Sequence, residues 1–206
     1  MKSSQAQMFI VSAPSGAGKT SLVRRVIADL DNVAVAVSHT TRGMRPGDVD
    51  GQDYHYIERP TFEKMIDDDQ FLEYAEVFGN YYGTSVASVD QLIDQGKDVI
   101  LEIDWQGAAQ VKRMLEDVVW IFILPPSRAE LLERLRGRGQ DSDEVIERRT
   151  QDAVAEMQQY HLADYLIVND VFDEALIELK SVIVAHRVTR ARQSMRHAGL
   201  ITSLIH

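Results

Sequence analysis

The sequence predicts an α/β fold in which helices cover both faces of a parallel sheet. Short, continuously apolar runs are typical of buried parallel strands, and segments with helical periodicity separate the later runs. A glycine-rich loop joins the first apolar run to the first helical segment, near the start of the chain. A long segment at 38–83 interrupts this alternation, and because it lies between two predicted core strands, it predicts an inserted lobe.

The first predicted strand covers residues 8–13 and leads through the glycine-rich loop into a helix that ends near residue 29. Residues 33–37 form a second strand, which is short and β-branched. Ser127 and Glu130 have capping-box spacing, which predicts the start of a helix at residue 128. The remaining predicted strands lie at 99–103, 118–124 and 165–168, and the remaining helices at 108–115, 128–136, 143–161 and about 173–194.

Two stretches depart from simple alternation. The first, 38–83, is rich in glycine, tyrosine, arginine and acidic residues, with strand-like pieces at 54–57 and 73–78 and a helix near 61–68. The second, 134–149, is dense in arginine and is interrupted by Gly137 and Gly139. Glycines beside a charged helix predict a hinged flap there.

The composition is that of one soluble domain, since 206 residues can bury a full core and 45% of them are hydrophobic. A net charge of −10 argues against a general attraction to nucleic-acid backbone. No cysteine is present, which excludes disulfides and thiol chemistry. The N-terminal MKSSQAQ lacks the apolar core of a signal peptide, and the apolar run at 118–124 is too short to span a bilayer. We expect a cytoplasmic protein without nucleic-acid or membrane partners.

The loop PSGAGKT has the features of a phosphate-binding loop. Gly16 and Gly18 allow positive φ, so that backbone amides point at an anion, and the following helix adds unpaired N–H groups. Lys19 supplies a mobile cation and Thr20 a hydroxyl ligand for Mg²⁺. The alternative is a glycine-rich turn without a ligand. The predicted ATP-binding residues here are Ala13, which replaces the first glycine of the motif, Pro14, Ser15, Gly16, Ala17, Gly18, Lys19, Thr20 and Ser21.

A second anion site is predicted in the inserted segment. Arg42 and Arg45 stand three residues apart in a turn rich in glycine and proline, and guanidinium groups donate paired hydrogen bonds to phosphate oxygens. Glu73 is an acid in an otherwise apolar setting. A solvated loop with ordinary surface charge is the alternative. The tyrosines that offer donors and flat surfaces in this segment are Tyr54, Tyr81 and Tyr82.

Acids and arginines further along the chain complete the candidate site. Glu102 and Asp104 stand two apart at the end of a predicted strand, so both point to one face if the chain is extended. Asp104 lies where such sheets place ligand chemistry and could hold Mg²⁺, or it could cap the following helix. The arginines of the flap would favour a transferring phosphoryl group or form a solvated basic face: Arg134, Arg138, Arg148 and Arg149.

Seven motifs together resemble the guanylate kinase family in their order and spacing. They are SAPSGAGKTSL, SHTTRGMRPGDVDGQDYHY, EVFGNYYGTS, EIDWQGA, FILPPS, RLRGRGQD and YLIVND, and they run from about residue 8 to residue 185. The resemblance implies a P-loop core, a GMP-binding lobe and a lid. The predicted domain covers 6–186, with core segments 6–37 and 97–186, a GMP-binding lobe at about 38–96, a lid at about 134–150 and a helical tail at 187–206.

The resemblance also implies transfer of the γ-phosphoryl group of ATP to GMP, and to dGMP, with Mg²⁺ as cofactor. By resemblance, the guanine base would be read by Ser38, Glu73 and Thr84, and the GMP phosphate held by Arg42, Arg45, Tyr54 and Tyr82. Glu102, which replaces the aspartate of many relatives, and Asp104 would complete the GMP site, and Thr20 and Asp104 would serve the metal. Lys19, Arg134, Arg138 and Arg149 would stabilise the transferring group, and Asn169 would lie near the adenine.

Two other functions are compatible with parts of the sequence. A GTPase switch would share the phosphate loop, and residues 104–107 match D-x-x-G, but the base-reading motif N-K-x-D is absent from the sequence. A catalytically inactive, protein-binding relative would be expected to carry a damaged loop and lid, whereas Lys19 and Thr20 are present here. Whether the chain forms a homo-oligomer stays open.

Overall fold

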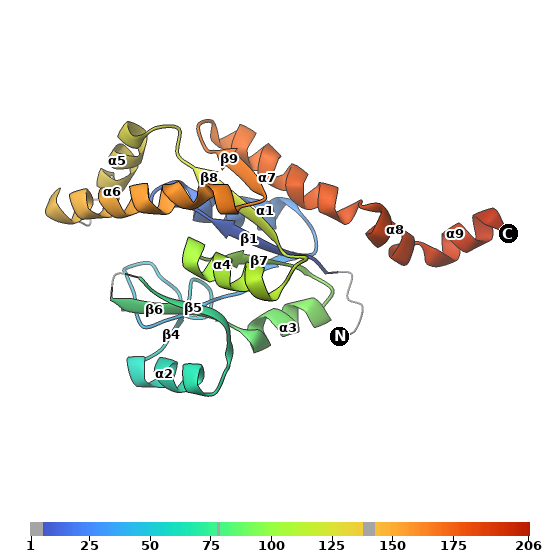
Figure 1. Ribbon diagram of the computed structural model, residues 1–206, viewed down its shortest axis with the longest axis horizontal. Helices are drawn as coiled ribbons and strands as arrows, with labels where there is room; N and C mark the ends of the chain where they lie inside the picture. Colours follow the sequence, from blue (N-terminus) through green and yellow to red (C-terminus); the bar gives the residue numbers. More distant parts are fainter. Residues whose placement is uncertain (1–5, 78, 138–142) are drawn as a thin grey trace.

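The computed structural model describes residues 6–77, 79–137 and 143–206, and for 143–149 it describes the backbone only. Figure 1 shows a central sheet between two layers of helices, a second sheet beside it, and a C-terminal helical segment that projects from the body. Within the described residues, no helix is long and apolar enough to cross a membrane.

The central sheet is entirely parallel and has five strands in the order β2-β7-β1-β8-β9. It confirms the predicted alternation of buried strands and helices. The second strand ends at Val35 rather than at residue 37, because the chain leaves the sheet edge there to enter the second sheet. The bounds are β1 Met8–Ser12, β2 Val33–Val35, β7 Asp98–Glu102, β8 Val119–Leu124 and β9 Tyr165–Val168.

Alternate residues of β1 divide the core into two apolar layers. Phe9 and Val11 face α1 (Lys19–Asp29) and α7 (Phe172–Arg187), whereas Ile10 faces α3 (Val86–Asp94) and α4 (Trp105–Met114). All three side chains are fully buried. Burial of apolar surface on both faces fixes β1 at the centre of the sheet, and the loop that follows it is therefore held on a rigid base.

The inserted segment forms a second sheet in the order β4-β3-β6-β5, in which only β3 and β4 are parallel. Its apolar face is aromatic: Phe62 stacks on Phe71 and Tyr81, with ring centroids 4.4 and 5.1 Å away. The predicted end of the lobe at residue 96 stays a prediction. Helix α3 lies within the predicted lobe but packs on the central sheet. The bounds are β3 His39–Thr40, β4 His55–Tyr56, α2 Arg59–Asp67, β5 Phe71–Val77 and β6 Asn80–Ser85.

The remaining helices lie C-terminal to β8. Helix α5 (Arg128–Arg136) begins as predicted, and the Ser127 hydroxyl accepts a hydrogen bond from the Glu130 amide. Helix α6 (Asp143–Met157) changes to a 3₁₀ turn at Gln158–Leu162, so the helix predicted to reach residue 161 is regular only to residue 157.

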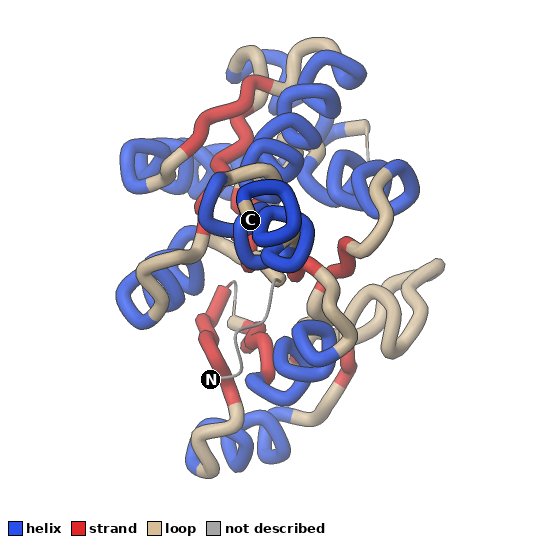
Figure 2. Tube along the Cα trace, turned by 90° about the vertical axis from the view of Figure 1, so that its right-hand side faces the viewer, coloured by secondary structure: helices blue, strands red, loops and turns tan. Residues whose placement is uncertain are grey.

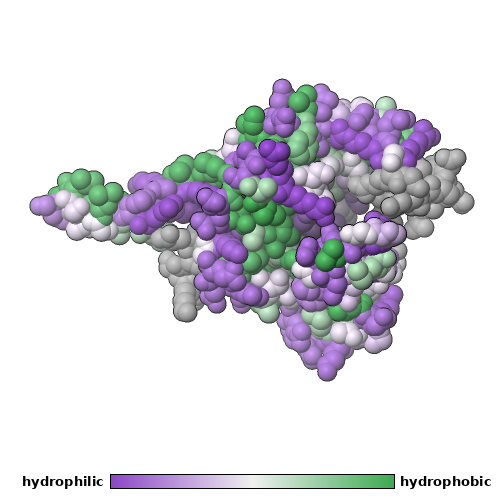
Figure 3. All heavy atoms as spheres, turned by 180° about the vertical axis from the view of Figure 1, so that it is seen from behind, coloured by the Kyte–Doolittle hydropathy of each residue, from purple (hydrophilic) through white to green (hydrophobic). Residues whose placement is uncertain are grey.

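The prediction of one last helix at 173–194 was wrong, because α7 ends at Arg187 and two short helices follow, α8 (Arg190–Arg196) and α9 (Ala198–Ile205). Arg187 is held by the Asp98 carboxylate at 2.7 Å and by the Asp31 carbonyl at 2.8 Å, which fixes the end of α7 against the body. Figure 2 views the projecting segment end-on, and Figure 3 shows hydrophobic atoms at its tip.

Candidate active site

A cavity of about 730 Å³ opens between the carboxyl ends of the central strands and the second sheet. The loop after β1 lines one side of it, and residues of β5 and β6 and the turns around β3 line the other. The phosphate loop and the second sheet therefore face one shared cavity, in which two ligands could meet. The predicted site residues that line the cavity are Ala13, Pro14, Ser15, Gly16, Gly18, Lys19, Thr20, Ser21, Ser38, Arg42, Arg45, Tyr54, Glu73, Tyr82, Glu102 and Asp104.

The loop after β1 adopts the backbone path that the sequence predicts. Gly16 and Gly18 have φ of 94° and 91°, a region that side chains with a Cβ rarely enter. Ala13 is not among the residues with positive φ, and its methyl group packs on the core. The alanine at the first motif position is therefore compatible with the loop. Helix α1 begins at Lys19, so its first amides are directed toward the cavity.

Asn169 holds the backbone of this loop through a side-chain hydrogen bond. Its side-chain amide donates to the Ala17 carbonyl at 2.7 Å, and the residue is buried. A Cβ at Gly18 would lie 2.3 Å from the same amide nitrogen, so Gly18 is required for close approach as well as for its φ. Arg134 donates to the Asn169 carbonyl at 3.2 Å, which ties α5 to the same point.

Polar side chains predicted for the site lie at the mouth of the loop. The Lys19 ammonium group donates to the Ile103 carbonyl at 3.3 Å, and the Thr20 hydroxyl donates to the Glu102 carboxylate. One Asp104 oxygen accepts from the Gly107 amide at 2.8 Å, so Asp104 caps α4. Capping is the structural alternative that the sequence left open, and the second Asp104 oxygen accepts from the Gln106 side-chain amide at 3.5 Å.

Ser38, Glu73 and Thr84 meet in a buried pocket across the cavity. The Ser38 and Thr84 hydroxyl oxygens are 3.0 Å apart, and a Glu73 oxygen accepts from the Thr84 amide at 2.9 Å. Glu73 is 4% exposed, and this burial raises its pKa to about 7. A carboxylate and two hydroxyl groups thus form a preorganised set of acceptors and donors. Gly107 lies against the second Glu73 oxygen, which a Cβ at that position would approach to 2.3 Å.

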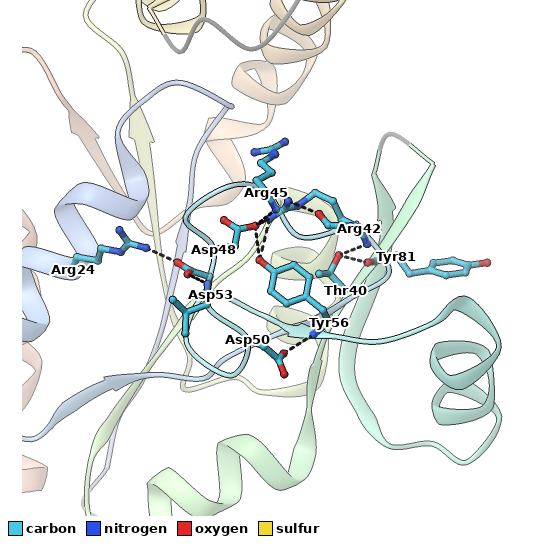
Figure 4. A network of polar contacts seen from close by, with 11 residues as sticks. Arg24, Thr40, Arg42, Arg45, Asp48, Asp50, Asp53, Tyr56 and Tyr81 are labelled. Atoms are coloured by element: carbon cyan, nitrogen blue, oxygen red, sulfur yellow. Dashed lines mark hydrogen bonds and ion pairs between the residues drawn. The ribbon is translucent and has the colours of Figure 1, made fainter.

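Arg42 is held in place by an acid and an aromatic ring that the sequence did not single out (Figure 4). Its guanidinium group pairs with Asp48 at 2.8 Å, and the Tyr56 hydroxyl donates to the same carboxylate at 2.6 Å. The Tyr56 hydroxyl and the Arg45 amide lower the pKa of Asp48 to about 2. The Arg45 amide donates to Asp48 at 2.9 Å, whereas its guanidinium group forms no hydrogen bond or ion pair with the described residues and points away from this network in Figure 4.

The two tyrosines predicted for this site lie together, with the Tyr54 and Tyr82 ring centroids 5.7 Å apart. Burial raises the pKa of Tyr54 to about 12, so its hydroxyl group stays a hydrogen-bond donor at neutral pH. The Arg42 guanidinium carbon lies 5.5 Å from the Tyr54 ring centre. Arg24 of α1 also reaches across the cavity and pairs with Asp53 of the inserted segment at 2.5 Å (Figure 4).

Comparisons with known proteins agree with this geometry. A sequence model of one family, described as guanylate kinase, matches residues 5–186. The chain belongs to the guanylate kinase family. The guanylate kinase of Psychrobacter arcticus is 56% identical over 198 residues, which cover 96% of this chain and 95% of that protein. The guanylate kinase of Escherichia coli is 53% identical over 203 residues, 98% of each chain.

A crystal structure of guanylate kinase from Anaplasma phagocytophilum superimposes with a TM-score of 0.73 at 32% identity. It covers 92% of this chain and 90% of that one. The α/β fold with a parallel central sheet is therefore that of the guanylate kinase family, as the sequence predicts.

Sequence reasoning also missed an acid that reaches the cavity from a distant helix. Glu156, near the end of α6, lines the cavity together with the phosphate loop. Burial raises its pKa to about 7, although nearby Lys19 and a backbone hydrogen bond from Ser15 both oppose the rise. Helical periodicity cannot reveal this contact, because it depends on where α6 packs in the folded chain.

Not every predicted arginine can be placed in the guanylate kinase site. Arg134 lies outside the cavity lining and pairs with Glu130 at 2.9 Å in addition to its contact with Asn169. Arg138 falls outside the described residues, as do the side chains of Arg148 and Arg149. The catalytic roles predicted for these arginines stay predictions.

Proposed function

We propose that this chain transfers the γ-phosphoryl group of ATP to GMP, giving ADP and GDP, with Mg²⁺ as cofactor. The observation that carries the proposal is one cavity with a phosphate loop on one side and the buried Ser38–Glu73–Thr84 pocket on the other. Membership of the guanylate kinase family supports the same reaction. We place this activity in cytoplasmic purine nucleotide metabolism.

The buried pocket has the chemistry to recognise guanine. Guanine presents its N1–H and 2-amino groups as adjacent donors, and the Glu73 carboxylate can accept from both. The Ser38 and Thr84 hydroxyl groups can donate to O6. Because Glu73 is enclosed and already fixed by the Thr84 amide, a base without these donors would leave a buried carboxylate unsatisfied.

The charged turn beside this pocket fits the phosphate group of GMP. Arg42 is pre-oriented by Asp48 and Tyr56, and Arg45 offers a second guanidinium group at the cavity wall. The hydroxyl groups of Tyr54 and Tyr82 add neutral donors. Together they give a dianionic phosphate several charged and directional hydrogen bonds.

Oxygen ligands for Mg²⁺ are present beside the phosphate loop. The Thr20 hydroxyl contacts the Glu102 carboxylate, and Asp104 lines the same part of the cavity. Among the described residues no group of three or more His, Cys, Asp or Glu side chains is placed to hold a metal, so phosphate oxygens and water would supply most of the Mg²⁺ ligands. When bound, the metal would neutralise charge on the β- and γ-phosphates.

The proposed reaction requires positioning and charge more than a reactive side chain, since the acceptor is already a phosphate dianion. The amides of the loop and Lys19 would bind the donor phosphates, while the arginine turn would hold the acceptor in line with them. Arg134, Arg138 and Arg149 are proposed to stabilise the transferring group, and Asn169 to support the loop beneath the adenosine.

A coupled assay of ADP release tests the proposal directly. With ATP and Mg²⁺ constant, GMP, AMP, UMP, CMP and dTMP are compared as acceptors, and strong activity is expected with GMP alone. Activity with another base would overturn the guanine assignment. GTP without an acceptor is the control, since efficient hydrolysis of GTP would point to a GTPase.

A further inference from the structure

Glu156 is a partly buried acid that the proposed reaction does not use, and it lines the cavity together with the phosphate loop. Its carboxylate lies at the phosphate loop, where the Ser15 backbone forms a hydrogen bond with it and Lys19 is close enough to stabilise its charge. A loop of this kind selects anions, because its amides and lysine converge on negative charge. An acid from α6 thus meets the same groups that a nucleotide phosphate needs.

A carboxylate and a phosphate oxygen cannot both use these groups. The Ser15 amide is a single donor, and the negative charge of Glu156 would repel a triphosphate held in the loop. The amino-terminal end of α1 cannot retreat from the cavity, since this helix is packed on the core through Leu22, Val23 and Val26. Glu156 must therefore be the group that moves.

We propose that Glu156 is an internal competitor of ATP: its carboxylate occupies the phosphate loop of the nucleotide-free protein and leaves when the triphosphate binds. This inference rests on the proposed binding of ATP to the loop. The apparent ATP affinity is then the affinity of the unoccupied loop multiplied by the fraction of time for which Glu156 is away from the loop.

The test measures the affinities of ATP and of inorganic pyrophosphate by calorimetry in the absence of GMP. Glu156→Gln removes the negative charge, and Glu156→Asp keeps the charge but withdraws it by one methylene group. If the carboxylate leaves the loop free for a third to a tenth of the time, both variants should bind both ligands about three- to tenfold more tightly. GMP affinity should not change in either variant.

Glu178→Gln is the matched control, because Glu178 is an exposed acid of α7 outside the cavity lining, and its affinities should equal those of the wild type. Unchanged or weaker ATP binding by Glu156→Gln overturns the proposal. Tighter ATP binding by Glu156→Gln but not by Glu156→Asp also overturns the proposal. The charge of residue 156 would then weaken ATP binding without the carboxylate having to occupy the loop. The wild-type acceptor assay tests the phosphoryl transfer separately, so failure of this proposal leaves that result intact.

Discussion

Replacing Gly107 by alanine should damage the reading of guanine from a position that never touches the nucleotide. A Cβ at residue 107 would lie 2.3 Å from the second Glu73 oxygen and 3.1 Å from its carboxyl carbon. Glu73 is enclosed and is fixed on its other side by the Thr84 amide. The carboxylate must therefore shift by about 1 Å to reach an ordinary van der Waals separation.

A shift of this size misaligns the carboxylate with the two guanine donors. Loss of one hydrogen bond to a charged group corresponds to about 1.5–3 kcal/mol, or roughly a 10- to 100-fold fall in kcat/KM for GMP. Folding should be maintained, because alanine is more favourable than glycine within a helix by about 1 kcal/mol, which offsets part of the crowding.

The assay compares kcat/KM for GMP with the affinity for ATP, which should stay at the wild-type value because the new methyl group crowds Glu73 and no residue of the phosphate loop. Gly199→Ala is the matched control, since Gly199 lies in α9 and a Cβ there meets no atom within 4 Å. Full GMP efficiency in a folded Gly107→Ala protein would show that the Glu73 carboxylate does not hold the base.

Three further predictions address the site. Lys19→Ala should lower kcat by roughly 10²–10³ while the thermal melting temperature changes little, since the loop amides remain; a folded variant with near-normal kcat would contradict the catalytic role of Lys19. Glu73→Gln should lower kcat/KM for GMP at least tenfold and reduce the preference for GMP over IMP, which lacks the 2-amino group; unchanged discrimination in steady-state kinetics would place guanine recognition elsewhere. Because the pKa of Glu73 is raised from 4.5 to about 7, the folded protein binds this proton more tightly than the unfolded chain, so the contribution of Glu73 to the free energy of unfolding should fall as pH rises through that range. As pH rises over the same range, kcat/KM for GMP should rise, because the Glu73 carboxylate becomes ionised. If Glu73→Gln shows the same rise of kcat/KM with pH, Glu73 is not the group that titrates.

The features that the sequence predicted well are those that depend on local pattern. The positive φ at Gly16 and Gly18 follows from the glycine spacing of one loop, and the start of α5 follows from the Ser127 hydroxyl. The family motifs placed Ser38, Glu73 and Thr84 in one site, although they come from three separate stretches of the chain.

The features that were missed depend on packing between distant segments. Glu156 is one acid among several on α6, and only the docking of that helix brings it to the phosphate loop. Asp48 and Tyr56 were passed over because their task is to hold Arg42. The end of α7 at Arg187 is set by a contact with Asp98, which lies 89 positions earlier in the chain. The hydrophobic periodicity of a helix carries no information about such a distant contact.

The central place of β1 in the sheet has a consequence for how the chain folds as it is synthesised. Within the described part of the chain, β1 pairs with β7 and β8, so its neighbours are complete once residues 98–102 and 119–124 have been made. At about 5–20 residues per second, β1 waits roughly 5–20 s for both partners. The second sheet draws all its strands from residues 39–85 and is complete earlier. We therefore expect the inserted lobe to form while the hydrophobic strand that anchors the phosphate loop is still unpaired, so this interval is when the nascent chain is most exposed to aggregation.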